Sequence, residues 1–164
     1  MSISPTPTHI HKPPKYLVCV DNREECRAAL KLVCMKALAR QGQVDMLHVT
    51  PPADFQTLGA VADRMREERR QEGETLLKML ADEAHAMYGV RPTPILREGA
   101  IGDEIIATAL ADANIIMVVI GIAHNHSSRG TLASWLAGQL GNKFPIPLLM
   151  VPGTLTDQQL SNLV

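Results

Sequence analysis

The side chains best suited to chemistry follow one apolar stretch in the last third of the chain. Residues 115–120 are uncharged and mostly β-branched, and they lead through Gly121 into a polar loop before a helical pattern begins at Thr131. Such a short apolar run predicts a strand buried on both faces. A strand that passes through a glycine-containing loop into a helix often binds an anion, because the loop amides and the helix N-terminus carry partial positive charge.

The polar loop carries imidazole, hydroxyl and guanidinium groups, namely His124, His126, Ser127, Ser128 and Arg129, followed by Gly130. The hydroxyls and the guanidinium are suited to an anion. The two histidines could ligate a metal, but a solvated or anion-facing pair is the favoured interpretation. A serine hydrolase needs a Gly-x-Ser-x-Gly turn and an acid that orients the histidine, and the sequence shows neither. The loop therefore favours anion binding, with solvated histidines as the simpler alternative.

The composition limits the classes of function. Apolar residues make up 46% of the 164 residues and aromatic residues 3%, which predicts one domain with an aliphatic core. A formal net charge of −1 gives no electrostatic basis for binding nucleic acid or an anionic membrane. The sequence has no apolar run of the ~18 residues that span a bilayer, no apolar leader, and three cysteines without metal spacing. We therefore expect a cytoplasmic protein that binds no metal.

Strand and helix patterns alternate along the chain. The predicted strands, the first four of them followed by amphipathic helices, are 16–20, 44–49, 92–96, 115–120 and 147–151. This alternation predicts a doubly wound α/β fold with a parallel sheet and helices on both faces. Its ligand crevice lies beyond the carboxyl ends of the strands, where the strand order reverses, which places Asp21 and Gly121 there. We expect a disordered tail at 1–14, the domain at 15–153 and a polar tail at 154–164.

Three of the helices carry more specific predictions. The first should begin with a capping box in which Asn22 caps the helix and Glu25 reaches back, and its two cysteines lie on the apolar stripe. The second is charged on most faces over 64–74, which indicates a solvated segment held by ion pairs; a partner-binding face is the alternative. On the fourth, Trp135 lies nearly opposite the apolar stripe and should face the crevice or a neighbouring molecule.

Several segments match those of a known family. They are Val20-Asp21, Leu47-His48-Val49, the glycine after the fourth strand, and the closing segment 145–152 with the sequence PIPLLMVP. Together they resemble the universal stress protein family over Tyr16 to Pro152. The resemblance implies a five-stranded sheet in the order 3-2-1-4-5, of the adenine-nucleotide alpha-hydrolase-like type. It also implies a cytoplasmic homodimer and, in many members, bound ATP or AMP.

The family's nucleotide signature, Gly-x2-Gly-x9-Gly-Ser/Thr, is only partly present. Counted back from the closing segment without gaps, its four positions are Gly121, His124, Ser134 and Trp135. Only the first matches. A glycine lets the backbone approach a phosphate, a histidine side chain obstructs that approach, and an indole replaces the phosphate-binding hydroxyl. We therefore expect weak or absent ATP binding.

Two positions that resemble the family's adenosine side, Asp21 and Val49, are intact. Asp21 has a structural alternative, because carboxylates often end a strand and favour the following helix N-terminus. A bound nucleotide or small anion is expected at ten positions, namely Asp21, Val49, Gly121, His124, Ser127, Ser128, Arg129, Gly130, Ser134 and Trp135. No residue is predicted to be catalytic.

These observations predict a universal stress protein-like module for stress response or regulation, which is non-catalytic, dimeric and has a degenerate ATP site. The alternative is a switch that binds ATP or AMP and hydrolyses ATP slowly. The dimer is expected through the fifth strand, because residues 148–151 form an apolar edge that would otherwise be exposed. The competing expectation is a monomer in which Leu155, Leu160 and Leu163 fold back over this edge.

Overall fold

Strands and helices alternate along the chain as the hydrophobic pattern predicts. The computed structural model describes residues 12–52, 59–123, 131–139 and 142–164. The strands are β1 (Lys15–Cys19), β2 (Gln43–Thr50), β3 (Thr93–Glu98), β4 (Ile115–Ile122) and β5 (Leu148–Pro152). The helices are α1 (Glu24–Arg40), α2 (Ala60–Tyr88), α3 (Ile101–Ala111), α4 (Thr131–Gln139) and α5 (Asp157–Ser161). In the described part of the chain, none of the helices combines the length and the apolar character that crossing a bilayer requires.

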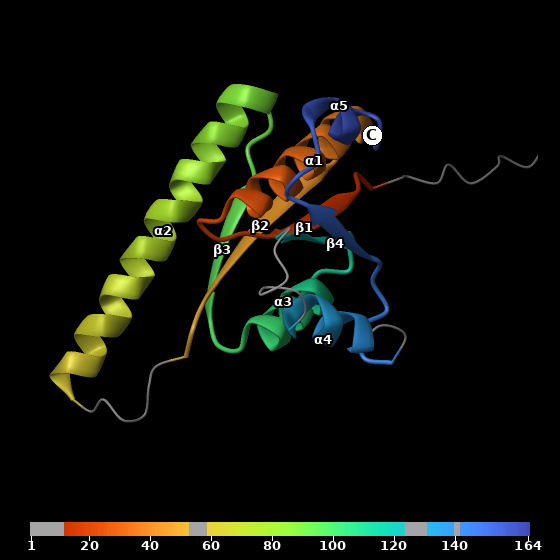
Figure 1. Cartoon of the computed structure of the whole chain (residues 1–164). Helices are drawn as coiled ribbons and strands as arrows, with labels where there is room; N and C mark the ends of the chain where they lie inside the picture. The colour runs from red at the N-terminus through yellow and green to blue at the C-terminus, as the bar shows by residue number, and fades with distance from the viewer. Residues whose placement is uncertain (1–11, 53–58, 124–130, 140–141) are drawn as a thin grey trace, which may run out of the picture.

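The five strands form one parallel sheet in the order β3-β2-β1-β4-β5, which confirms the predicted fold class and topology. Helices α1, α2 and α5 cover one face and α3 and α4 cover the other (Figure 1). Strand β4, between β1 and β5, is largely buried, but Ile116 near its start is 41% exposed. The strand does not break at Gly121 as expected; it continues to Ile122, and Gly121 pairs with Val151 of β5.

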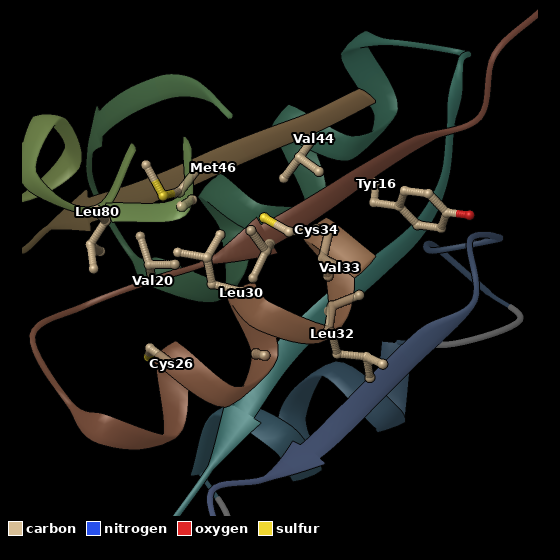
Figure 2. Close-up of a cluster of buried hydrophobic side chains, with 14 of the residues drawn as sticks. Tyr16, Val20, Cys26, Leu30, Leu32, Val33, Cys34, Val44, Met46 and Leu80 are labelled. Carbon is tan, nitrogen blue, oxygen red and sulfur yellow. The ribbon is translucent and has the colours of Figure 1, made fainter. Parts of the chain in front are cut away.

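Two hydrophobic clusters hold the helices to the sheet. The larger lies between the sheet and α1, α2 and α5, and it includes the helix cysteines Cys26 and Cys34, as predicted (Figure 2). The smaller lies under α3 and α4 and includes Ile105, Leu136 and Phe144. Because both faces of the sheet are covered, the strands are apolar on both sides, which is the pattern that a parallel sheet requires.

The start of α1 differs from the predicted capping box. Its N-cap is Arg23, which makes no side-chain cap hydrogen bond within the described residues. Glu25, which was expected to reach back to the cap, is buried. The carboxylate of Asp21 instead accepts a hydrogen bond from the backbone N–H of Arg23, at 2.7 Å. The chain therefore turns from β1 into α1 around Asp21 and not around Asn22.

Helix α2 has two halves with different surroundings. Residues 60–72 are all exposed or half-buried, whereas the buried positions, Leu77, Leu80, Ala81 and Ala84, follow Gly73. At Gly73 the helix lies close to β3, where an added Cβ would be 2.7 Å from the side chain of Leu96. The exposed half, which we call the α2 arm (residues 60–72), extends past the sheet (Figure 1).

The α2 arm is held mainly by ion pairs within the helix, as its sequence predicts. Arg64 pairs with Glu68 at 3.2 Å, and Arg70 pairs with Glu67 and with Glu74. One ion pair leads from the arm to the sheet, between Arg66 and Glu98 of β3 at 3.4 Å.

The last residues of the chain, expected as a polar tail, include the short helix α5, which packs against α1. Its start is a capping box between Thr156 and Gln159. Leu160 is 2% exposed and belongs to the larger hydrophobic cluster, and Lys36 of α1 donates a hydrogen bond to the carbonyl of Leu163 at 2.7 Å. Met150 of the edge strand β5 nevertheless remains 43% exposed.

Candidate functional site

The strand order reverses between β1 and β4, which lie side by side at the centre of the sheet. The chain leaves β1 through α1 toward β2, on one side, and leaves β4 through α4 toward β5, on the other. Cys19 pairs with Ile120, so Asp21 and Gly121 lie at the same carboxyl edge of the sheet. This edge is where an open parallel sheet forms its ligand crevice, and we call it the carboxyl-edge crevice.

Asp21 is a charged group at this crevice, and its carboxylate already has partners. Oδ1 accepts hydrogen bonds from Arg23 N at 2.7 Å and from the thiol of Cys26 at 3.1 Å. Oδ2 accepts one from Arg23 Nε at 2.6 Å. Burial by itself would raise the pKa of Asp21, but the hydrogen bonds from Arg23 and Cys26 outweigh it and lower the pKa. Asp21 is therefore an ionised acceptor that is held by its hydrogen bonds.

The two thiols near Asp21, of Cys19 and Cys26, are unreactive at neutral pH. Burial, with a smaller contribution from the charge of Asp21, raises the pKa of Cys19 to about 12. Burial and Asp21 also raise the pKa of Cys26. A thiol is a nucleophile or a metal ligand only as the thiolate, so both side chains act as packing groups. Within the described residues, no group of three or more His, Cys, Asp or Glu side chains could hold a metal ion.

Gly121 has a packing role that the sequence does not show. A Cβ at this position would lie 2.5 Å from the carbonyl carbon of Glu25 and 2.9 Å from the backbone N of Cys26. Gly153, just after β5, lies under the same turn, where its Cβ would be 2.8 Å from Glu25 Cβ. These two glycines let the first turn of α1 lie directly on β4 and the end of β5.

Val49 lies on β2, next to β1, and faces the smaller hydrophobic cluster. It is half-buried and pairs with Arg97 of β3. The preceding residue, His48, joins the ends of two strands, since its Nδ1 lies 2.8 Å from the carbonyl oxygen of Val20. Asp21 follows β1, Val49 is in β2 and Gly121 is in β4, so the three residues lie at the carboxyl ends of adjacent strands.

Ser134 and Trp135 lie inside α4 and not at its N-terminus, because the helix begins at Thr131. Trp135 is 40% exposed, in agreement with its predicted place off the apolar stripe. Its indole packs against Gly102 in the first turn of α3, where an added Cβ would be 2.5 Å from Trp135 Cε3. The gap-free count therefore places the final Gly-Ser/Thr pair of the signature, at Ser134 and Trp135, about one turn into the helix. In the sequence, Gly130 immediately precedes the first helical residue, Thr131.

The other predicted positions, His124, Ser127, Ser128, Arg129 and Gly130, lie outside the described residues. Sequence reasoning missed Arg23 and Cys26 as partners of Asp21. For Arg23, the available signal was its position two residues after an aspartate that ends a strand. It also missed the contact between Gly102 and Trp135, for which no local signal exists, because the two residues come from different elements.

Comparison with protein-family models matches residues 14–152 to the universal stress protein family. The chain belongs to this family. The predicted sheet order and the resemblance of the strand ends agree with this assignment. No curated protein matches the chain.

Solved structures share the universal stress protein fold at low sequence identity. A universal stress protein UspA from Lactobacillus plantarum superposes with a TM-score of 0.71 at 16% identity, over 84% of this chain and 97% of that one. A universal stress protein from Archaeoglobus fulgidus in complex with dAMP gives 0.59 at 18%, over 85% and 98%. A family protein from Arabidopsis thaliana with AMP bound gives 0.58 at 17%, over 88% and 97%. At these identities the likeness shows the fold alone.

Proposed function

We propose that this universal stress protein is a non-catalytic, dimeric regulatory module whose carboxyl-edge crevice takes an adenine nucleoside monophosphate in preference to Mg-ATP. The observation that carries the proposal is the state of Asp21, a carboxylate fixed at the switch point by Arg23 and Cys26. An acceptor that is already oriented costs little to organise when a nucleoside hydroxyl or amino group binds. The AMP and dAMP complexes of two structural relatives support a ligand of this size.

The chemistry of the crevice supports binding over catalysis. A general base works best when its pKa lies near the operating pH, and the ion pair with Arg23 moves the pKa of Asp21 the other way. The thiols of Cys19 and Cys26 stay protonated, because burial raises their pKa values. The carboxyl-edge groups that the structure describes are therefore suited to recognition.

A second candidate, an ATP-binding switch with slow hydrolysis, has one observation in its favour. Helix α4 begins at Thr131, directly after Gly130 in the sequence. If the loop is four residues shorter than the gap-free count assumes, this Gly-Thr pair takes the place of the final Gly-Ser/Thr of the signature. A hydroxyl at a helix N-terminus would then be available for a phosphate, and Trp135 would no longer mark a lost one.

The two candidates differ in which nucleotide binds. We would purify the protein without added nucleotide, denature it and identify any AMP or ATP released by chromatography. Calorimetric titration with AMP and with Mg-ATP then gives the two dissociation constants. The proposal expects AMP to bind at least tenfold more tightly. Mg-ATP binding at low-micromolar or tighter concentration, lost in Thr131→Ala, would favour the switch.

The role of Asp21 is tested by a matched pair of variants. Asp21→Asn should weaken AMP binding, because the amide carries no charge and presents one acceptor oxygen in place of two. Asp82→Asn is the control, since Asp82 is also a carboxylate whose pKa is lowered by ion pairing, on α2 and away from the crevice. Equal AMP affinity in both variants would show that Asp21 has only a structural role.

The dimer is proposed through the edge of β5. Met150 is the residue to change because its side chain is 43% exposed, whereas the neighbouring Leu149 packs against the larger core cluster. Sedimentation equilibrium should give twice 17.9 kDa for the native chain and 17.9 kDa for Met150→Lys. Met87→Lys, at an exposed methionine of α2, is the control and should stay dimeric. A native species of 17.9 kDa that is unchanged by a tenfold rise in concentration would exclude the dimer.

A further inference from the structure

A cavity opens between the first turn of α3 and the start of α4. Its volume is about 300 Å³, and the described residues that line it are Ala100, Ile101, Gly102, Asp103, Leu132 and Trp135. None of Asp21, Val49 and Gly121 lines it, so it is distinct from the described part of the carboxyl-edge crevice. This volume is at the lower end of the range for small-molecule sites, and we call it the α3–α4 cavity.

The indole of Trp135 forms one wall of this cavity. Its six-membered ring lies so close to Gly102 that any larger residue there would overlap Cε3 and Cζ3. The side chain is nevertheless 40% exposed, and Ile101 beside it is 39% exposed. An exposed indole is a notable feature in a chain with one tryptophan and 3% aromatic residues. It offers an aromatic surface to a ligand in the cavity.

The described residues that line the α3–α4 cavity carry negative charge. Asp103 is the one ionisable residue among the described residues that line it. Asp103 is exposed and forms no ion pair within the described residues. Glu104 adds a second carboxylate in the same helical turn. Two full negative charges outweigh the partial positive charge of roughly half a unit at the α3 N-terminus.

From this combination we propose that the α3–α4 cavity binds a small organic cation, a quaternary or protonated amine with an apolar body. The face of an indole attracts such a cation through the ring quadrupole, and tryptophan is the best of the aromatic side chains for this. Ile101 and Leu132 would contact the apolar body, and the carboxylate of Asp103 would lie near the positive charge. The proposal does not rest on the proposed nucleotide function: the cavity shares Trp135 with the positions expected from the family signature, but it uses none of Asp21, Val49 and Gly121, and its ligand has the opposite charge.

The test uses Trp135 as its own reporter, since it is the only tryptophan in the chain. The probe is choline, titrated while tryptophan emission is recorded, with sodium chloride added to keep the ionic strength constant. The control ligand is 3,3-dimethylbutan-1-ol, which has the same shape without the charge. We expect a saturable change with choline in the millimolar range or tighter, and binding of the neutral compound at least tenfold weaker. No saturable change, or equal affinities, would overturn the proposal.

Two variants test the residues by calorimetry. Asp103→Asn should weaken choline binding about tenfold while the neutral compound is unaffected, and Asp82→Asn should change neither. Gly102→Ala should abolish choline binding, because the added methyl group displaces the indole. Circular dichroism would establish that the Gly102→Ala protein is folded, and Asp103→Asn decides the matter if it is not. Unchanged choline affinity in Asp103→Asn would refute the assignment.

Discussion

Replacing Gly121 by alanine separates a packing role from a ligand-binding role for this residue. The methyl group would meet the backbone of Glu25 and Cys26, at 2.5 Å and 2.9 Å from the nearest carbonyl carbon and amide nitrogen. Backbone atoms cannot rotate away as a side chain can, so the first turn of α1 must move off the sheet. Gly121 is not among the glycines with positive φ, so backbone conformation adds no further cost.

The expected loss of stability follows from overpacking in a filled core, which typically costs about 1–3 kcal/mol. With a urea dependence of roughly 2 kcal/mol per molar, the unfolding midpoint should fall by about 0.5–1.5 M. Gly138→Ala is the matched control, because an added Cβ there meets nothing within 4 Å and the residue lies inside α4. Alanine should stabilise that helix by roughly 0.5–1 kcal/mol.

Both variants would be measured by urea unfolding, followed by far-ultraviolet circular dichroism at one temperature and protein concentration. If Gly121→Ala unfolds at the native midpoint while Gly138→Ala is stabilised, α1 does not approach β4 as closely as described. If Gly121→Ala lost nucleotide binding without losing stability, Gly121 would have the ligand-binding role that the family signature implies.

Three further outcomes follow from the packing and the pKa shifts. Leu160→Ala should cost about 2–5 kcal/mol in urea unfolding, because its side chain is 2% exposed in the larger cluster; a cost below 1 kcal/mol would mean that α5 is only loosely attached. Dithionitrobenzoate should label no cysteine of the native protein near pH 8, because burial raises the pKa of Cys34 to about 12 and also raises the pKa values of the other two thiols. All three cysteines should react in denaturant. One thiol that reacts rapidly in the native protein would contradict this. The lowered pKa of Asp21 stabilises the folded protein at pH values above the unfolded pKa of about 3.9, and this stabilisation is lost as the pH falls through the lower folded pKa. Asp21→Asn should therefore lower the free energy of unfolding at pH 7 and make it depend less steeply on pH in the acid range. An unchanged pH dependence in the acid range would refute the ion pair with Arg23.

The sheet order and the layers could be predicted because the information is local and repeated. Each strand is a short apolar run and each helix has its own stripe, so errors of one to three residues at the ends leave the alternation intact. The predicted capping of α1 by Asn22 was wrong because Asp21 and Asn22 are adjacent and both can accept a hydrogen bond from the backbone that follows. The structure shows that Asp21 accepts this hydrogen bond, from Arg23 N, and the local sequence does not decide between the two residues.

The candidate site was harder to predict because its contacts join distant elements. The family signature depends on the length of the loop before α4, and a gap-free count cannot detect a change in that length. The observed start of α4 at Thr131 therefore changes the interpretation of Ser134 and Trp135. In the same way, Gly121 appears in the sequence as a signature glycine, and only the position of Glu25 above it reveals a packing reason.

The two halves of α2 should also behave as separate units of local unfolding. Because the α2 arm, residues 60–72, depends on ion pairs that water and salt can replace, its amide hydrogens should exchange with solvent far faster than those after Gly73. The helix can open from its start up to Gly73 without breaking a core contact. For the same reason, whole turns could be inserted or deleted in the arm over evolution while the sheet and its crevice stay unchanged.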